Sequence, residues 1–470
     1  MRVTRRQALA AAMAAPVFAQ RDKRPNILFA ISDDQSFPHT GAAGDPVVRT
    51  PHFDRIAAEG VRFPFAYCSS PSCTPSRGAI LTGQECYRLR EGMNLWSSLP
   101  SDIPVYTDLL EQAGYHVGHS RKGWGPGDFS AGGRKRNPAG EQYKTFESFF
   151  EARPKNQPFC FWFGSQDPHR PYEKGTGLAS GLRIEDVVVP QFLPDEREVR
   201  SDILDYFYEI ERFDRDIGLI LSVLERAGEL DNTLVVVTSD NGMPFPRAKT
   251  NLYDHGVRLP LAMRWPERIR GGRVVEDFVS FVDFAPTFLE LAGVDRPREM
   301  TGRSLVPQLD SHDSGRIDSA RDHVIVARER HTIRRAGGVG YPMRAIRTHD
   351  ALYIRNIEPD RWPAGDPPTF GDIDGSPTKD LLLENRETPG IRRYFELACA
   401  KRPTEELYDM AYATDQTANV AGQPAYSDLQ NRLQQRLDAH LRETLDPRAL
   451  GQPGTWESAP YYGRGGSRLL

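Results

Sequence analysis

The sequence has little cysteine, almost no net charge and no internal apolar run long enough to span a membrane. The cysteines are five in 470 residues, which is too few and too irregular for a disulfide scaffold: Cys68, Cys73, Cys86, Cys160 and Cys399. Their odd number leaves one unpaired, and Cys68 with Cys86 is the only pairing of sequence neighbours to consider. The 60 Lys and Arg residues nearly balance the 64 Asp and Glu residues, which excludes a basic nucleic-acid binder.

Only the amino terminus is apolar enough to raise the question of a membrane or export segment. Thr4-Arg5-Arg6-Gln7 precedes a small apolar run over residues 8–15, and Val17-Phe18-Ala19 resembles a small-residue cleavage site. This pattern predicts a twin-arginine export signal over residues 1–20 and a periplasmic or extracellular protein, although a basic end on an Ala-rich helix is the alternative. No later stretch approaches the roughly 18 apolar residues that span a bilayer, so we expect no membrane span.

Three short, nearly continuous apolar runs indicate strands buried on both faces of a parallel sheet. They cover residues 26–31, 159–163 and 233–238. Each is followed by polar residues: Ser32-Asp33-Asp34, Gln166-Asp167-Pro168-His169 and Ser239-Asp240-Asn241. Ligands bind at the carboxyl ends of strands in open α/β sheets, so we expect a functional site at this edge.

Helical patterns alternate with these strands. Ser201 is a plausible N-cap for a long amphipathic helix that stops at Gly228, and residues 105–114 and 282–293 indicate shorter helices. After about residue 320 the pattern changes to strands over 324–327 and 343–357, the second a hairpin turning at His349-Asp350, then a Pro/Gly-rich loop over 359–377 and a helix with leucines from 429 to 441. We predict an α/β fold with a doubly wound, mostly parallel sheet over residues 21–320 and a smaller α+β domain over 321–470.

Two pairs of oxygen-bearing residues follow buried strands. Asp33-Asp34 and Asp240-Asn241 would meet at one edge of a shared sheet, and hard cations such as Ca²⁺ or Mg²⁺ prefer carboxylate and amide oxygens. No His-Glu-x-x-His motif or paired Cys-x-x-Cys motif points to zinc. Each pair alone is more often a turn former or a helix cap, but the two together favour a metal site.

A third segment, Cys73-Thr74-Pro75-Ser76-Arg77, lies in a Ser/Pro-rich loop that leads into a helix at Gly78-Ala79-Ile80-Leu81. This places Cys73 near a helix N-terminus, where anions are stabilised and a thiol is polarised. The alternative is a buried structural cysteine beside a proline-initiated turn.

This pentapeptide, with Asp33-Asp34 before it and Asp240-Asn241-Gly242 after it, resembles the signature of the sulfatase family. Further matches at Thr50-Pro51-His52-Phe53-Asp54 and Thr301-Gly302-Arg303-Ser304-Leu305 extend the resemblance over nearly the whole chain after the signal. The resemblance implies an alkaline-phosphatase-like fold and oxidation of Cys73 to Cα-formylglycine by a separate maturation enzyme. It also implies one Ca²⁺ held by Asp33, Asp34, Cys73, Asp240 and Asn241.

The resemblance also assigns roles to cationic residues. Arg77, Lys122 and Lys249 would hold the negative oxygens of a sulfate group, and His169 would contact the sulfate and protonate the leaving group. Taken singly, Lys122 and Lys249 would be solvated surface charges, and His169 a loop histidine bonded to backbone carbonyls.

Within the family, four segments resemble the heparan N-sulfatase branch: residues 167–170, 238–246, 250–253 and 341–344. There are two departures: Lys249 stands where that branch has Arg, and Gly123-Trp124 replaces residues that usually end in His. Three residues of the smaller domain are candidate substrate contacts, with ordinary surface or interdomain positions as the alternative: Glu329, His331 and Arg344.

The sequence thus predicts a sulfatase that acts on a sulfated carbohydrate, with the N-sulfoglucosamine of heparan-type glycans favoured. Three alternatives remain: an O-sulfatase on another sulfated glycan, a phosphomonoester or phosphonate hydrolase of the same superfold, and a glycan-binding relative without turnover. The pattern gives no prediction of the oligomeric state.

Overall fold

The computed structural model describes residues 24–412, 414–452, 454 and 456–463. The expected export signal at residues 1–20 lies outside the described residues. In the described part of the chain, no helix is both long enough and apolar enough to cross a membrane.

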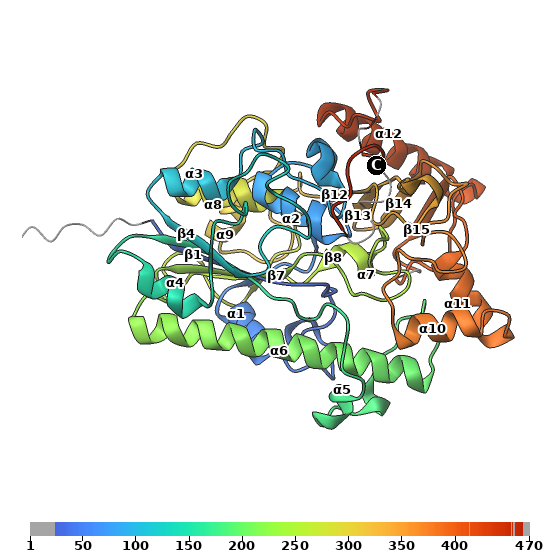
Figure 1. Cartoon of the computed structure of the whole chain (residues 1–470), viewed down its shortest axis with the longest axis horizontal. Coiled ribbons are helices and arrows are strands. Elements are labelled where there is room, and N and C mark those ends of the chain that lie inside the picture. The colour runs from blue at the N-terminus through green and yellow to red at the C-terminus, as the bar shows by residue number, and fades with distance from the viewer. Residues whose placement is uncertain (1–23, 413, 453, 455, 464–470) are drawn as a thin grey trace, which may run out of the picture.

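An eight-stranded sheet forms the centre of the larger part of the molecule, in the order β10-β2-β9-β7-β1-β6-β4-β5 (Figure 1). The neighbours from β7 through β1, β6 and β4 to β5 pair in parallel, whereas β9 is antiparallel to β7 and β2. The strands are β1 Asn26–Ser32, β2 Val61–Arg62, β4 His116–Arg121, β5 Glu141–Tyr143, β6 Phe159–Gly164, β7 Thr233–Ser239, β9 Ala262–Arg264 and β10 Arg273–Val274. The predicted parallel sheet is confirmed.

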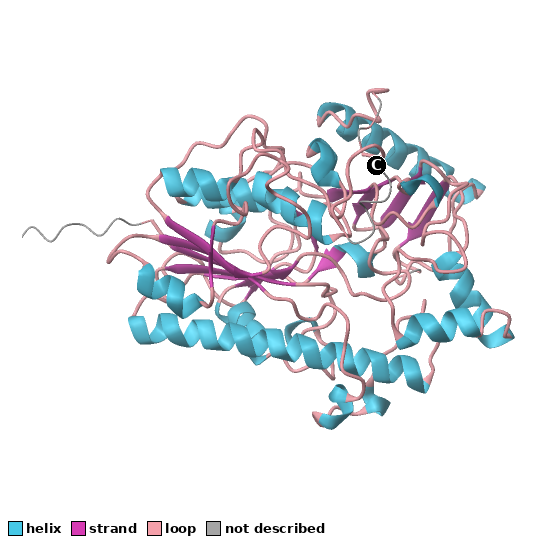
Figure 2. Ribbon diagram, viewed as in Figure 1, coloured by secondary structure: helices cyan, strands magenta, loops and turns pink. Residues whose placement is uncertain are grey.

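Side chains of β1 alternate between two cores, as a strand buried on both faces requires. Phe29 and its i±2 neighbours pack with helices α2, α3 and α8, while Leu28 and Ala30 pack with α1, α4 and α6. Figure 2 shows these helices in one layer on each face of the sheet, so the fold is doubly wound.

The helices that complete the fold vary widely in length. They are α1 Pro51–Glu59, α2 Cys73–Thr82, α3 Tyr106–Gln112, α4 Phe146–Ala152, α5 Thr176–Ala179, α6 Arg197–Ala227, α7 Asp254–Val257, α8 Phe284–Leu291, α9 Val306–Asp310, α10 Pro377–Glu384, α11 Pro389–Cys399 and α12 Ser427–Glu443. Short 3₁₀ turns cover Gly41–Ala43, Cys86–Arg88, Arg90–Met93, Ile184–Asp186, Phe281–Asp283, Ala336–Gly338 and Pro424–Tyr426.

A four-stranded antiparallel sheet forms the smaller part, in the order β12-β13-β14-β15. Its strands are β12 His323–Arg328, β13 Met343–Thr348, β14 Ala351–Asn356 and β15 Glu405–Asp409, and a separate small sheet joins β3 Ala66–Tyr67, β8 Arg258–Leu259 and β11 Val279–Ser280. The predicted hairpin turn at His349-Asp350 joins β13 to β14. Because one apolar core runs from β1 into β12, β13 and β14, the two sheets are packed together. The boundary at residue 320 stays a prediction.

The long helix α6 begins earlier than the sequence pattern indicates. It starts at Arg197 after an extended Glu196, whereas we expected its cap at Ser201. The first turn is mostly charged and hides the helical period, although its one apolar residue, Val199, is fully buried. Gly228 ends the helix in the left-handed region at φ 66°, as predicted.

All five cysteines are buried free thiols. The pairing of Cys68 with Cys86 that the sequence left open is therefore wrong for this structure. The Cys86 sulfur lies 3.2 Å from the carbonyl oxygen of Ser69, so its thiol bonds to the backbone instead.

Strands β4 and β6 approach each other closely at Gly164, the last residue of β6. A Cβ at this position would lie 1.7 Å from the carbonyl oxygen of Lys122. That oxygen accepts hydrogen bonds from Arg77 Nη1 at 2.9 Å and from Trp162 Nε1 at 3.1 Å. The absence of a side chain at Gly164 therefore keeps the strand ends in place.

We predict that Gly164→Ala lowers the free energy of unfolding by about 2 kcal/mol or more, because the added methyl displaces the Lys122 carbonyl and its two donors. Equilibrium denaturation measures this change. The control is Gly390→Ala in α11, where a Cβ meets no atom within 4 Å and where we expect a change of about 0.5 kcal/mol or less. Equal stability of the two variants would contradict the prediction.

Candidate active site

Two adjacent strands deliver the acidic residues of the site. Strands β1 and β7 pair in parallel up to Ser32 and Ser239, so that Asp33-Asp34 and Asp240-Asn241 leave the same edge of the sheet. The backbone N–H of Asp34 donates to Asp240 Oδ1 at 3.1 Å, and Asp34 turns the chain in the left-handed region at φ 77°. The sheet register therefore brings together the two pairs that are far apart in sequence.

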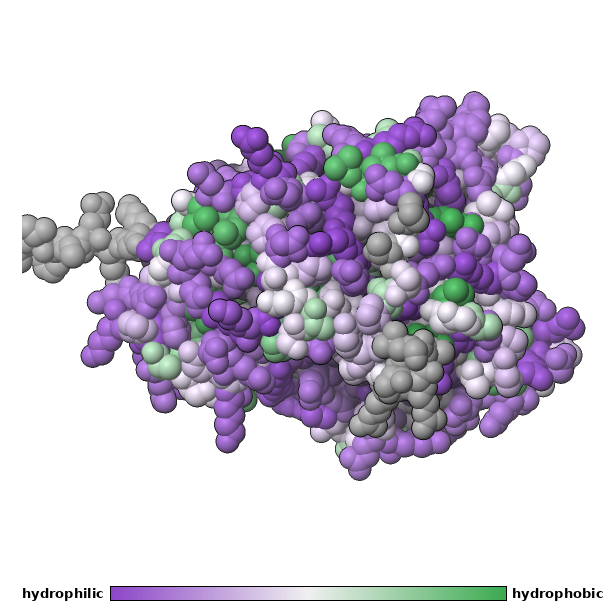
Figure 3. Space-filling view, turned by 45° about the horizontal axis from the view of Figure 1, so that its top comes forward, coloured by the Kyte–Doolittle hydropathy of each residue, from purple (hydrophilic) through white to green (hydrophobic). Residues whose placement is uncertain are grey.

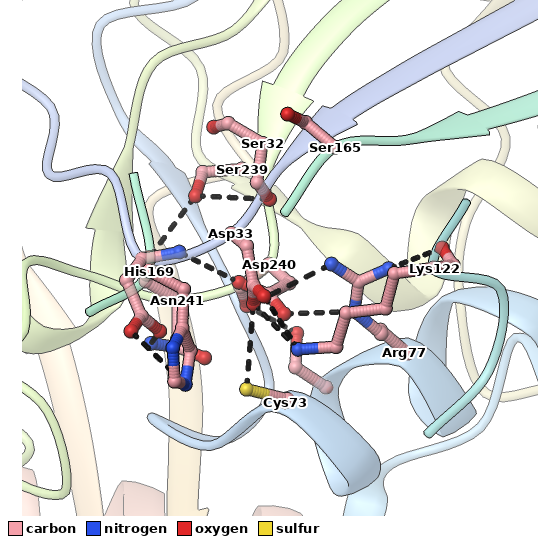
Figure 4. Close-up of polar contacts among 12 residues, drawn as sticks. Ser32, Asp33, Cys73, Arg77, Lys122, Ser165, His169, Ser239, Asp240 and Asn241 are labelled. Atoms are coloured by element: carbon pink, nitrogen blue, oxygen red, sulfur yellow. Dashed lines mark hydrogen bonds and ion pairs between the residues drawn. The ribbon is translucent and has the colours of Figure 1, made fainter. Parts of the chain in front are cut away.

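Cys73 lies beside these carboxylates. The sequence placed it near the N-terminus of a helix at residues 78–81, and the helix in fact begins at Cys73 itself, whose sulfur is 3.5 Å from Asp33 Oδ1 (Figure 4). The candidate ligand atoms of Asp33, Asp34, Cys73 and Asp240 all lie within 4.8 Å of one another, and all four residues are buried. This cluster could hold a metal ion.

Asn241 completes the cluster with an oxygen that has no hydrogen-bond partner among the described residues. Its Nδ2 donates to Asp34 Oδ1 at 2.7 Å and to the Gly242 carbonyl oxygen at 3.1 Å, while Oδ1 is buried and unpaired. A buried acceptor without a donor is costly, and beside three carboxylates a cation is the partner that satisfies it. The set of hard oxygens suits Ca²⁺ or Mg²⁺.

Two carboxyl groups of the cluster, Asp33 and Asp240, have pKa values shifted in opposite directions. Burial raises the pKa of Asp33, but attraction to Lys122, His169 and Arg77 outweighs burial and holds that pKa far below its usual range. Burial and repulsion by Asp33 instead raise the pKa of Asp240 to about 6. The raised pKa of Asp240 reflects repulsion among the buried carboxylates, and a cation bound between them would relieve it.

Three cationic side chains surround the carboxylates. Arg77 is fully buried, and its Nε donates to Asp240 Oδ2 at 2.8 Å. Lys122 Nζ reaches both oxygens of Asp33, at 2.7 and 2.6 Å, and Lys249 Nζ lies 2.7 Å from Asp34 Oδ2. Burial lowers the pKa of Lys249, but attraction to the carboxylates of Asp34 and Asp374 outweighs burial and raises that pKa well above its usual range. The ammonium therefore stays charged. These residues form a positive wall suited to a tetrahedral anion.

His169 faces the cluster from the loop after β6. Its Nδ1 is 2.6 Å from the Arg170 carbonyl oxygen, which can only accept, so Nδ1 carries the proton. Its Nε2 lies 3.9 Å from Asp34 Oδ2, and the side chain is 37% exposed. Nε2 is therefore free to exchange a proton with a molecule bound in front of the cluster.

The Cys73 thiol is a poor nucleophile in this setting. Burial raises its pKa well above the usual range, and the attraction of Lys122 does not overcome the burial. Asp240 and Asp33 add to the rise. The unmodified sulfur is thus a neutral thiol at ordinary pH.

The three candidate substrate contacts from the smaller domain lie in different settings. Glu329 and Arg344 are paired with each other at 2.9 Å and are bound further by Arg448 and Asp446, in a buried charge network. His331 lies at the site, where its Nδ1 is 2.8 Å from Ser72 Oγ, the residue before Cys73. Burial lowers the pKa of His331 to about 3, so the ring is neutral.

The sequence pattern gives no role in the site to two residues that lie there, Asp374 and Trp124. Asp374 Oδ2 lies 3.1 Å from Lys249 Nζ, although it comes from the loop between β14 and α10. No local motif marks it, because the contact depends on how the smaller sheet packs on the larger one. Trp124, at one departure from the N-sulfatase pattern, is 4% exposed and packs toward Gly78 of α2, which no spacing indicates.

An open cleft of about 820 Å³ lies beside the cluster. Its lining includes Asp33, Lys122, His169, Trp96, Arg121 and Arg136. The cleft gives a solute of the size of a sugar access to the buried charges.

Comparisons with known proteins all find members of one family. The family model described as "Sulfatase" matches residues 25–294. The chain is 30% identical to human N-sulphoglucosamine sulphohydrolase over 93% of this chain and 94% of that protein. It is 25% identical to an N-acetylglucosamine-6-O-sulfatase of Bacteroides thetaiotaomicron over 86% of this chain and 88% of that protein.

A solved structure of a protein in complex with its substrate, D-glucosamine-2-N,6-O-disulfate, shares the fold with a TM-score of 0.64 and 22% identity, over 90% of this chain and 98% of that one. The fold is thus the alkaline-phosphatase-like fold of sulfatases, as predicted. The match over more than half of the chain, together with the human relative, shows that this protein belongs to the sulfatase family of sulfuric ester and sulfamate hydrolases.

Proposed function

We propose that this sulfatase removes the N-sulfate of glucosamine in a heparan-type glycan, with a formylglycine made from Cys73 and one bound Ca²⁺. The observation that carries the proposal is the position of Cys73, at the start of α2 and within 3.5 Å of Asp33, inside a ring of cations. The choice of an N-sulfated glucosamine rests on the human relative and on a relative in complex with glucosamine disulfate.

The oxygens of Asp33, Asp34, Asp240 and Asn241 and the modified residue 73 would hold the calcium ion. When present, the ion adds positive charge at the strand ends, and the hydrated aldehyde of formylglycine offers a hydroxyl for attack on sulfur. The rest of the chemistry belongs to groups of the chain itself.

Lys122, Arg77 and Lys249 bind and orient the sulfate oxygens with charge that is already in place before the substrate enters. His169 lies on the exposed side, and its doubly protonated ring, with Nδ1–H on the Arg170 carbonyl oxygen, donates the Nε2 proton to the departing nitrogen or oxygen. In the free enzyme Nδ1 stays bonded to the Arg170 carbonyl oxygen, which fixes the orientation of the ring.

The twin-arginine pattern of Thr4-Arg5-Arg6-Gln7 supports export to the periplasm or beyond. The Cys-x-Pro-x-Arg segment supports a second partner, a maturation enzyme that oxidises Cys73. The alternatives are an O-sulfatase, a phosphate or phosphonate hydrolase and a non-catalytic glycan binder, and a persistent unmodified thiol at residue 73 in the native host would favour the last.

We predict that Cys73→Ser reduces sulfate release by at least about 10³-fold, because a serine alkoxide cannot collapse to an aldehyde and expel sulfate. Release from N-sulfoglucosamine measures the loss, and mass spectrometry of the peptide around residue 73 checks the modification in the parent protein. The matched control is Cys399→Ser in α11, which we expect to retain activity. Full turnover by Cys73→Ser would refute the proposed chemistry.

We predict that removing calcium lowers the thermal midpoint and the activity together, and that added Ca²⁺ restores both. A ligand at a thousandfold excess over its Kd stabilises the folded state by about 4 kcal/mol. Thermal unfolding with chelator and with Ca²⁺ measures the shift, and Asp240→Asn should abolish most of it. A thermal midpoint that does not change with calcium in either the parent protein or Asp240→Asn would exclude a calcium ion bound at this site.

We predict that the matured enzyme hydrolyses N-sulfated glucosamine with a kcat/KM at least about tenfold above that for 6-O-sulfated glucosamine, a difference of about 1.4 kcal/mol in the barrier. Sulfate release from the two matched sugars gives the ratio. Preference for the 6-O-sulfate would replace the N-sulfatase assignment and leave the family unchanged. Faster cleavage of an aryl phosphate than of the matched aryl sulfate would instead favour the phosphate hydrolase.

A further inference from the structure

Asp374 places a carboxylate in a site that is otherwise built to attract an anion. It lies in the loop between β14 and α10, and its Oδ2 is 3.1 Å from Lys249 Nζ. Its side chain is 29% exposed, whereas the Lys249 side chain is 5% exposed. The carboxylate therefore stands between the buried cation and the solvent.

The backbone around Asp374 is fixed on both sides. Two residues earlier, the buried Asp372 accepts hydrogen bonds from Arg328 Nη2 and Arg335 Nη2, at 2.5 and 2.6 Å. Two residues later, Ser376 caps α10, and Lys379 of that helix donates to the Ile373 carbonyl oxygen at 2.8 Å. Asp374 is therefore held at the site by its surroundings and is not a loop residue that reaches Lys249 by chance.

The same anchor also holds the segment that carries Lys249. Arg328 Nη1 donates to the carbonyl oxygen of Thr250 at 2.5 Å, while Nη2 of the same guanidinium binds Asp372. One buried arginine thus fixes the positions of Lys249 and Asp374 relative to each other.

Asp374 is ionised across the ordinary pH range. Burial raises its pKa, but attraction to nearby cations, Lys249 above all, brings the value down to about 2. Lys249 does not need this second carboxylate to stay charged, because Asp34 Oδ2 already lies 2.7 Å from its Nζ. A further negative charge at this point weakens the attraction of Lys249 for a sulfate, so binding of the anion alone does not explain it.

Asp374 and His169 are linked through the Asp34–Lys249 pair. Lys249 Nζ and His169 Nε2 approach the same oxygen of Asp34, at 2.7 and 3.9 Å, and Asp374 Oδ2 lies 3.1 Å from that Lys249 Nζ. His169 is the proposed proton donor to the leaving group. The Asp374 carboxylate therefore belongs to the same group of side chains as this donor, at the part of the site that the leaving group would occupy.

We propose that Asp374 is a specificity-determining residue that favours a leaving group which departs as an amine. This inference rests on the proposed function. The S–N bond breaks with its electron pair staying on nitrogen, the sulfuryl group passes to the nucleophile at residue 73, and His169 supplies the proton that completes the amine. The proton that the attacking hydroxyl loses as it bonds to sulfur goes to the amine as the second proton and makes the ammonium that Asp374 holds. A phenolate or an alkoxide gains nothing from this carboxylate.

The first test compares Asp374→Asn with the parent protein on N-sulfoglucosamine and on 4-nitrophenyl sulfate, whose leaving group is an anion. We expect kcat/KM for the sulfamate to fall about 10- to 100-fold, the value of a hydrogen bond to a charged group, and kcat/KM for the aryl sulfate to change little. Asp380→Asn, an exposed position in the first turn of α10, is the matched control. An equal loss of kcat/KM on both substrates would overturn the inference, because it would show that Asp374 only holds Lys249 in place and does not select the leaving group.

The second test measures binding of glucosamine and of inorganic sulfate to the full chain by calorimetry. We expect Asp374→Asn to weaken glucosamine binding about tenfold and to leave sulfate binding unchanged or tighter, because the lost charge attracts the amine and repels the anion. Equal weakening of both, or no glucosamine binding to the parent in the millimolar range, would overturn the inference. This readout does not need turnover.

The two tests also separate this inference from the proposed function. A parent protein that hydrolyses neither substrate contradicts the proposed function, while glucosamine and sulfate binding still decide the role of Asp374. A parent that hydrolyses N-sulfoglucosamine well, with an unchanged substrate ratio in Asp374→Asn, contradicts this inference alone.

Discussion

The structure depends on the repulsion between carboxylates that two neighbouring parallel strands bring together. The pairing of Ser32 with Ser239 leaves Asp33, Asp34 and Asp240 buried at one edge, where like charges cannot coexist without compensation. Arg77, Lys122 and Lys249 come from three other segments to supply it. An anionic substrate then meets a wall of cations whose positions the protein's own acids have set.

The parts of the site that belong to strands and short motifs could be predicted from the sequence. Buried parallel strands have a continuous apolar pattern, so the residues that follow β1, β6 and β7 could be placed at one edge, and the structure brings Asp33, Asp240 and His169 together there. Cys73 was expected near a helix N-terminus, and it is the first residue of α2, which begins five residues before the helix that the sequence indicated. The roles of these residues in catalysis stay predictions.

Contacts between the two sheets could not be read from any local pattern. Glu329 and Arg344 were candidates for the substrate, yet they are buried in one charge network with Asp446 and Arg448. Asp374 was missed, because its approach to Lys249 depends on the packing of a loop that is distant in sequence. The start of α6 was hidden for a different reason, since its first turn is mostly charged and only Val199 is buried there.

The face of the molecule in Figure 3 is largely hydrophilic, with small, separated hydrophobic patches. Large exposed apolar residues of the described chain, such as Val188, Leu219 and Tyr412, belong to different segments. Scattered apolar residues of this kind are normal on a protein surface and mark no site by themselves.

Arg328 anchors the loop after β14 at residue 372 and leaves the side chain of residue 374 out of that anchor. The guanidinium secures the loop through Asp372 and the backbone of Thr250, whereas the carboxylate at residue 374 takes no part in that attachment. With the role proposed for Asp374, support and recognition would belong to separate side chains two positions apart. An exchange at residue 374 would then change the preferred leaving group while Arg328 still holds the loop and the ion-binding oxygens stay as they are.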